Sequence, residues 1–221
     1  MARIAIVPIA LGLLAACTET TASAARVRAD AAARLPKIRS AALLSLDVKE
    51  YLVSAGGVAE FKEDWSAAAR EAIGSALIAE FKARNIELRR VEVAPETAEE
   101  VDDLRALSQA VTASVGFPGA PFEYSLGPVA PLLDRYGVDA LVFVVGRGRL
   151  TTYGRRFLAG FSTGASEVDA TQVALIIVDR SGDVVWYNTR GLRGGDADLR
   201  GGGSAAGLMR AMVEDLPAHK P

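Results

Sequence analysis

Val138-Asp-Ala-Leu-Val-Phe-Val-Val145 is an apolar run of strand length that is rich in β-branched residues. This composition favours a strand that is buried on both faces. A second such run, residues 171–179, follows after a long segment. Arg180-Ser-Gly-Asp183 then predicts a turn with Gly182 at positive φ, so that residues 184–188 return as a hairpin partner. These strands predict the centre of a sheet.

Upstream and downstream of this centre, helices alternate with strands. Further strands are predicted at residues 41–53 and 86–93, with Gly56-Gly57 ending the first. Helices are predicted at residues 65–84, 97–115, 127–136 and 204–216. Their signals are an Asp64 cap, a Thr97–Glu100 capping box, a Gly137 stop and a Ser204 cap. Asn85 suits a left-handed stop after the first long helix.

The predicted order is β-α-β-α-α-β, a long loop, a β-hairpin and a final helix. Parallel strands joined by helical crossovers in the first half, followed by antiparallel strands, predict an α/β (α+β) fold with a single mixed β-sheet. We expect the helices to pack mainly on one face of this sheet. Residues 41–221 form a single globular domain in this interpretation, without an internal repeat.

The first 17 residues indicate export. Arg3 supplies a positive charge, residues 4–16 are almost wholly apolar, and Leu14-Ala15-Ala16 leads into Cys17, the only cysteine of the chain. A charged start, an apolar run too short to span a bilayer and small residues at a cleavage site are typical of a signal peptide. An ordinary secretory signal that happens to place Cys17 near the cut is the alternative.

Residues 14–17 resemble the lipobox of bacterial lipoproteins. This resemblance implies cleavage between Ala16 and Cys17, lipid attachment at Cys17, and a lipidated tether over residues 17–40. Thr18, rather than Asp, at the second mature position implies the outer membrane, with the protein facing the periplasm. Because Cys17 is then acylated, no thiol remains for a disulfide bond.

The composition limits the classes of function. The 221 residues are 50% hydrophobic and 24% charged, which is typical of a globular chain. The formal net charge of -2 does not favour nucleic acid as a partner. After the signal, no apolar run approaches the length of a membrane span, so we expect lipid to be the only anchor. We predict no cofactor and no metal site.

Gly160-Phe-Ser-Thr-Gly164 matches the nucleophile-elbow pattern of serine hydrolases. The elbow needs a strand before Ser162 and a helix after it, whereas a glycine-broken loop precedes Ser162 and a strand follows. His219, the only histidine, lies between prolines in what we interpret as a terminal tail. We therefore expect no enzyme and assign no catalytic residue.

Two acidic or glycine-rich segments could suggest ligand sites. The acidic run at residues 96–103 lacks a companion histidine or cysteine, so a solvated helix start is favoured over a metal cluster. Residues 194–203 could offer backbone N–H groups to an anion, or Asp196 and Asp198 to calcium. A flexible turn is the favoured interpretation of this segment.

Residues 147–170 contain basic residues beside apolar ones. Arg155, Arg156, Phe157 and Phe161 are the candidate contact surface, suited to an anionic membrane or a partner protein. The alternative is a mobile loop anchored on the core by its two phenylalanines. On the last strand, one of Trp186 and Tyr187 should be core and the other exposed.

The hairpin stretch Val178-Asp-Arg-Ser-Gly-Asp-Val-Val-Trp-Tyr-Asn188 is similar to one in an uncharacterised group of Gram-negative envelope lipoproteins. More distantly, the element order resembles the TolB amino-terminal domain, the penicillin-binding-protein activator lipoproteins and the curli-secretion lipoprotein. Those families imply envelope assembly, binding or secretion.

These observations predict a lipid-anchored, non-enzymatic binding or assembly component of the cell envelope. Its partner is expected to be an envelope protein, contacted through residues 147–170 and 191–203. An oligomeric secretion or pore component is one alternative, and a serine hydrolase acting through Ser162 is another.

Overall fold

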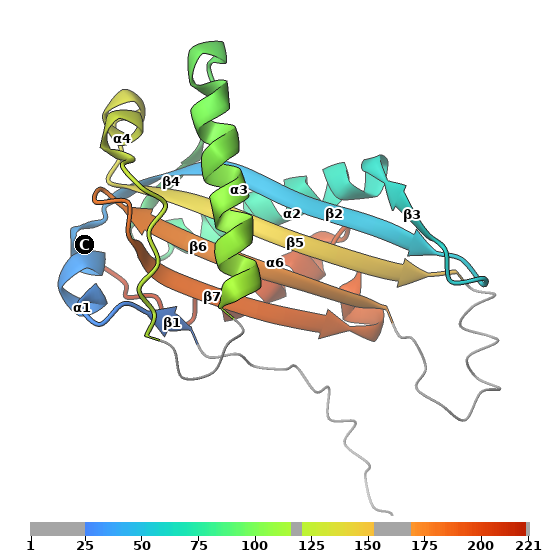
Figure 1. Ribbon diagram of the computed structural model, residues 1–221. Helices are drawn as coiled ribbons and strands as arrows, with labels where there is room; N and C mark the ends of the chain where they lie inside the picture. The colour runs from blue at the N-terminus through green and yellow to red at the C-terminus, as the bar shows by residue number, and fades with distance from the viewer. Residues whose placement is uncertain (1–24, 116–120, 153–168, 220–221) are drawn as a thin grey trace, which may run out of the picture.

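The computed structural model describes residues 25–115, 121–152 and 169–219. In these ranges seven strands form one mixed sheet in the order β1-β7-β6-β5-β2-β3, with β4 beside β2 (Figure 1). β2 runs parallel to β4 and β5, and the other pairs are antiparallel. This confirms the α/β fold with a single mixed sheet. The strands are β1 (Arg26–Val27), β2 (Ser40–Val53), β3 (Ala59–Lys62), β4 (Glu87–Arg90), β5 (Ala140–Thr151), β6 (Ala170–Asp179) and β7 (Val184–Arg193).

Helices cover both faces of the sheet, whereas the sequence predicts them mainly on one. α2 and α6 pack together on one face, and α3 crosses the other, with α4 beside it (Figure 1). The reason lies in β5 and β6, which are apolar at successive positions, so that each face needs a cover. The helices are α1 (Ala31–Arg34), α2 (Glu63–Lys82), α3 (Ala98–Ser114), α4 (Ala130–Tyr136) and α6 (Gly202–Met212).

The hydrophobic core therefore has two parts, one on each face of the sheet. On one face Val142, Leu175 and Trp186 pack with α2 and α6. On the other, Phe143 and Tyr187 pack with α3 and α4. Trp186 and Tyr187 are both buried, which corrects the expectation that one of them is exposed. That expectation assumed a sheet with one solvated face.

The carboxy-terminal part of the predicted tether, residues 25–40, belongs to the fold. β1 pairs with Trp186 and Tyr187 of β7, and Leu35 and Ile38 are buried in the core. Arg34 donates hydrogen bonds to Asp179 and Asp183 at 3.0 and 2.8 Å, which ties α1 to the β6–β7 turn. The domain thus includes residues 25–40, which the sequence analysis places in the tether. Ala16 and Cys17 lie outside the described residues.

The predicted turn and stop residues are confirmed. Asn85, Gly137 and Gly182 have φ values of 59°, 60° and 83°. Gly182 also needs the absence of a side chain, because a Cβ there would lie 1.7 Å from the carbonyl oxygen of Gly127. This close approach locks the β6–β7 turn against the segment that precedes α4.

The predicted caps Asp64 and Ser204 are wrong, whereas Thr97 is the N-cap residue of α3 but does not cap it through its side chain. α2 begins at Glu63, one residue before Asp64, and α6 begins at Gly202, two residues before Ser204. The Thr97 hydroxyl donates to the carbonyl oxygen of Ala94 and caps no N–H group of α3. Packing of the long helices on the sheet, rather than local capping, decides where they start. None of the helices in the described ranges has the length and apolar character to cross a bilayer.

Candidate functional site

One end of the sheet carries an open polar face on the side of α3. Along β2, β5, β6 and β7, alternate side chains point toward α2 and α6 or away from them. The outward residues nearest α3 still touch that helix, since the Gln109 amide donates to the Asp47 carboxylate at 2.5 Å. Beyond this contact no described helix covers the outward face.

Strand register arranges the outward residues of this face in two rows. The outer row runs from β3 to β7 through Phe61, Tyr51, Arg149, Ala170 and Arg193. The inner row runs from β2 to β7 through Lys49, Arg147, Gln172 and Gly191. Cationic and aromatic side chains from four strands, β2, β3, β5 and β7, are thereby brought together on one face.

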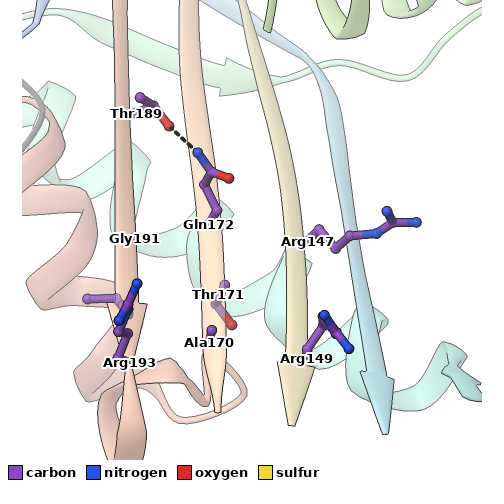
Figure 2. A pocket seen from close by; sticks show the side chains of 9 residues that line it. Arg147, Arg149, Ala170, Thr171, Gln172, Thr189, Gly191 and Arg193 are labelled. Atoms are coloured by element: carbon purple, nitrogen blue, oxygen red, sulfur yellow. Dashed lines mark hydrogen bonds between the residues drawn. The ribbon is translucent and has the colours of Figure 1, made fainter. Parts of the chain in front are cut away.

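A groove of about 480 Å³ lies at the centre of this face (Figure 2). Arg149 on β5 borders one side and Arg193 on β7 borders the other, while the Arg147 side chain extends from β5 away from β6, over β2. Ala170 on β6 lies between Arg149 and Arg193, and Gly191 lies on β7, two residues before Arg193; the small size of both residues leaves the space open. We call this feature the arginine groove; its members are Arg147, Arg149, Ala170, Thr171, Gln172, Thr189, Gly191, Leu192 and Arg193.

The three guanidinium groups of the arginine groove form no ion pair with any carboxylate in the described ranges. Arg147 instead lies over the ring of Tyr51, 5.0 Å from its centre, and donates to the Tyr51 hydroxyl at 3.3 Å. Arg147, Arg149 and Arg193 are all exposed. The groove therefore concentrates uncompensated positive charge, although the whole chain is slightly acidic.

The opposite side of the same strands holds a buried carboxyl group. Glu50 follows Lys49 on β2, points toward α2 and is fully buried. Its backbone N–H donates to the Ser66 hydroxyl at 2.9 Å, which in turn donates to the Lys62 carbonyl oxygen at 2.6 Å. Neither carboxyl oxygen has a hydrogen-bond partner among the described residues.

The surroundings of Glu50 change its ionisation. Burial raises its pKa to about 7, and the charge of Asp198 acts in the same direction, while Arg200 opposes both. Gly148 makes room for the carboxyl group, because a Cβ at this position would lie 1.9 Å from Oε2 of Glu50. Arg200 is held by Asp198 at 2.6 Å and lies 4.1 Å from the ring centre of Trp65.

The predicted contact residues lie outside the described residues, and only the ends of the segment that contains them are described. Arg155, Arg156, Phe157 and Phe161, and also Ser162, lie outside the described residues. The two ends of the segment 147–170 are described, and Arg147, Arg149 and Ala170 belong to the arginine groove. Arg193, from the second predicted contact segment, joins them across β6. Lys49, Tyr51 and Gln172 were missed, although the alternation along β2 and β6 places them on the same face.

His219 is not in a free tail, which corrects the prediction. It is buried, its backbone N–H donates to the Arg84 carbonyl oxygen at 2.9 Å, and its own carbonyl oxygen accepts from the Asn85 amide at 2.7 Å. The last described residues thus pack on the end of α2. The left-handed turn at Asn85 exposes backbone groups that bind them.

The glycine- and aspartate-rich segment is ordered, which corrects the flexible-turn interpretation. A short 3₁₀ helix, η3 (Gly194–Ala197), packs on the sheet, where the Thr171 hydroxyl donates to the Ala197 carbonyl oxygen at 2.7 Å. Ala197 and Leu199 are buried and anchor it. The described ranges contain no cluster of three or more His, Cys, Asp or Glu that could hold a metal ion.

The acidic start of α3 is exposed, as predicted. Glu96 pairs with Arg135, and Asp102 pairs with Arg105. Both pairs lie on the surface, which supports the interpretation of this run as a solvated helix start.

No protein-family model and no curated protein matches the sequence. Two solved structures of a PelC dodecamer from Paraburkholderia phytofirmans, one of them a point variant, match the fold with TM-scores of 0.41 and 0.38. In each case the sequence identity is 14%, and the match covers 90% of this chain and 98% of the other. Similarity of this extent assigns neither a family nor a function to the chain.

Proposed function

We propose that this chain is a lipid-anchored, non-enzymatic component of the bacterial cell envelope that binds an acidic envelope component through the arginine groove. The anchor is Cys17, at the end of a lipobox-like signal, and the domain faces the periplasm from the outer membrane. The fold supports this arrangement, because the chain enters the domain at β1 and leaves the arginine groove open on one face.

One observation carries the proposal. Arg147, Arg149 and Arg193 surround a single open groove and have no carboxylate partner among the described residues. Some exposed arginines elsewhere in the described ranges, such as Arg135 and Arg180, do have such partners, whereas Arg39 and Arg89 also lack an ion pair there. A local excess of positive charge on a slightly acidic protein attracts and orients an acidic ligand.

Binding without chemistry is supported by the position of Glu50. Its pKa of about 7 would suit a general acid or base. The side chain is nevertheless fully buried, so a dissolved substrate does not reach it. We therefore assign Glu50 a structural role and leave the function to the exposed face.

Two experiments test the proposal. Intact mass and fractionation of the full chain, beside Cys17→Ala, test the anchor: the wild type should carry acyl chains and stay in the membrane, and the variant should lose both. The second compares binding of the full chain to protein-stripped envelope fragments at low and high salt. Binding should weaken at high salt and in Arg147→Ala/Arg149→Ala/Arg193→Ala.

The matched control for binding is Arg135→Ala/Arg180→Ala/Arg210→Ala, which removes the same charge from exposed positions outside the groove. This control should bind like the wild type. Equal losses in the two triple variants would show that net charge, rather than the groove, drives binding. An unmodified, soluble wild type would remove the lipid anchor from the proposal.

A further inference from the structure

The distances between the charged groups of the arginine groove constrain the shape of a ligand that could bind there. Arg147 and Arg149 are two residues apart on β5, which separates their Cα atoms by about 7 Å. Arg149 and Arg193 share a register row two strands apart, which separates theirs by about 10 Å. Positive charges thus flank a track along β6 that is wide enough for one extended chain.

The floor of the track offers hydrogen bonds from side chains only. The Gln172 amide on β6 donates to the Thr189 hydroxyl on β7 at 3.5 Å, further along the strands from Arg149 and Arg193 (Figure 2). The backbone groups of β6 are paired with β5 and β7 on either side. An acidic peptide lying on this face would find no backbone partners for its own amide groups, whereas strand addition would supply them at a sheet edge.

A glycan fits this floor better than a peptide does. Its hydroxyl groups both donate and accept, as the Gln172 amide and the Thr189 hydroxyl require. The outer row also continues from Arg149 to Tyr51 and Phe61, whose ring centres lie 5.7 Å apart, and Phe61 is 44% exposed. These rings offer an apolar surface to the CH face of a sugar at the end of the row.

We infer that the arginine groove binds a linear glycan that carries carboxylate groups. This inference rests on the proposed function and names the ligand of the same site. Carboxylates suit the planar guanidinium groups of Arg149 and Arg193, which bind them through two parallel hydrogen bonds.

The test is a calorimetric titration of the purified full chain in detergent with oligogalacturonate, a linear glycan with a carboxylate on each sugar. Neutral dextran, polyglutamate and phosphatidylglycerol vesicles are titrated in parallel. Arg147→Ala/Arg149→Ala/Arg193→Ala should weaken oligogalacturonate binding about tenfold or more, since exposed charge pairs contribute up to about 1 kcal/mol each. Arg135→Ala/Arg180→Ala/Arg210→Ala should not weaken it.

Gln172→Ala separates glycan recognition from simple charge attraction. It should weaken oligogalacturonate binding about threefold or more, the loss of about one hydrogen bond, and leave any polyglutamate binding unchanged. Tighter binding of polyglutamate or vesicles than of oligogalacturonate would overturn the glycan inference while the proposed acidic-ligand function stands. If no acidic probe binds, or if both triple variants bind equally, the inference and the binding part of the proposed function fail together.

Discussion

The arginine groove and the surroundings of Glu50, which we call the Glu50 pocket and which include Ser66, Gly148 and Arg200, lie on opposite faces of the same strands. Successive residues of one strand therefore belong alternately to the one region and to the other. Arg147 and Arg149 point to solvent, while Gly148 between them faces Glu50. On β2, Lys49 is exposed, while Glu50 is fully buried. The comparison shows that alternation along a strand decides whether a charged residue is exposed to solvent or buried in the core.

The two regions should therefore respond differently to mutation. Exposed guanidinium groups stay hydrated and contribute little to folding. A buried carboxyl group without a hydrogen-bond partner is costly to ionise. We expect changes at the Glu50 pocket to alter the free energy of unfolding, and changes at the arginine groove to alter ligand binding alone.

The largest expected effect is the pH dependence caused by Glu50. Because the pKa of Glu50 is higher in the folded state, about 7, than the ordinary value of 4.5, the folded state binds the proton more tightly. Its stabilisation is complete below the ordinary pKa and declines as the pH rises through the folded pKa. Between these two values the free energy of unfolding should fall by about 3 kcal/mol, at 1.36 kcal/mol per unit.

Urea unfolding of the wild type and Glu50→Gln across this pH window measures the effect. The amide does not ionise, so the variant should lose this part of the pH dependence and be more stable than the wild type above neutral pH. Glu100→Gln, at an exposed position on α3, is the control and should follow the wild type. A Glu50→Gln variant with the wild-type slope would contradict the buried, ionisable state of Glu50.

A methyl group at Gly148 should produce the next largest effect. In Gly148→Ala the new Cβ would lie 1.9 Å from the Glu50 carboxyl group, which has to move within a packed core. We expect a loss of about 1–3 kcal/mol in the free energy of unfolding. Gly195→Ala, where a Cβ has nothing within 4 Å, should lose much less.

A double-mutant cycle tests whether Glu50 is the residue with which the new methyl group collides. If Glu50 is the partner, Gly148→Ala should cost much less in a Glu50→Ala background than in the wild type. An unchanged cost in that background would place the conflict elsewhere.

Smaller losses in the free energy of unfolding are expected when a single hydroxyl group is removed from each region, and the two losses should differ. Ser66→Ala leaves the buried N–H of Glu50 without its acceptor and should cost about 1–2 kcal/mol. Tyr51→Phe removes the hydroxyl that accepts from exposed Arg147 and should cost no more than about 0.5 kcal/mol. Chemical unfolding of both variants at one pH makes the comparison, and a reversed order would refute it.

The smallest effect on stability is expected at Arg149. Arg149→Ala removes an exposed side chain without an ion-pair partner in the described ranges, so the free energy of unfolding should stay within about 0.5 kcal/mol of the wild type. Thermal unfolding followed by circular dichroism checks this. A loss of several kcal/mol would show that Arg149 supports the fold.

The sequence predicts the sheet centre well, because β5, β6 and the Gly182 turn are encoded by local signals. Continuous apolar runs indicate strands buried on both faces, and a glycine at positive φ indicates the hairpin. The helix start at Thr97 was right in position, although its hydroxyl caps no N–H group of α3. The caps at Asp64 and Ser204 were wrong, since packing on the sheet overrides weak capping preferences.

The sites depend on long-range register and were harder to predict. Arg147 and Arg149 stand out from the sequence, but Arg193 joins them only through the pairing of β5 with β6 and of β6 with β7. The alternation along β2 separates Lys49 from Glu50, yet it does not say which face α2 covers. The burial of Glu50 therefore follows from tertiary packing alone.

The most direct test of the account is an amide chemical-shift map of the labelled full chain in detergent, titrated with oligogalacturonate. The account predicts shifts at the arginine groove, above all at Arg149, Gln172 and Arg193, with unchanged signals at Glu50, Ser66 and along α6. Shifts centred on α2 and α6, or no shifts at saturating ligand, would contradict the assignment of binding to the open face.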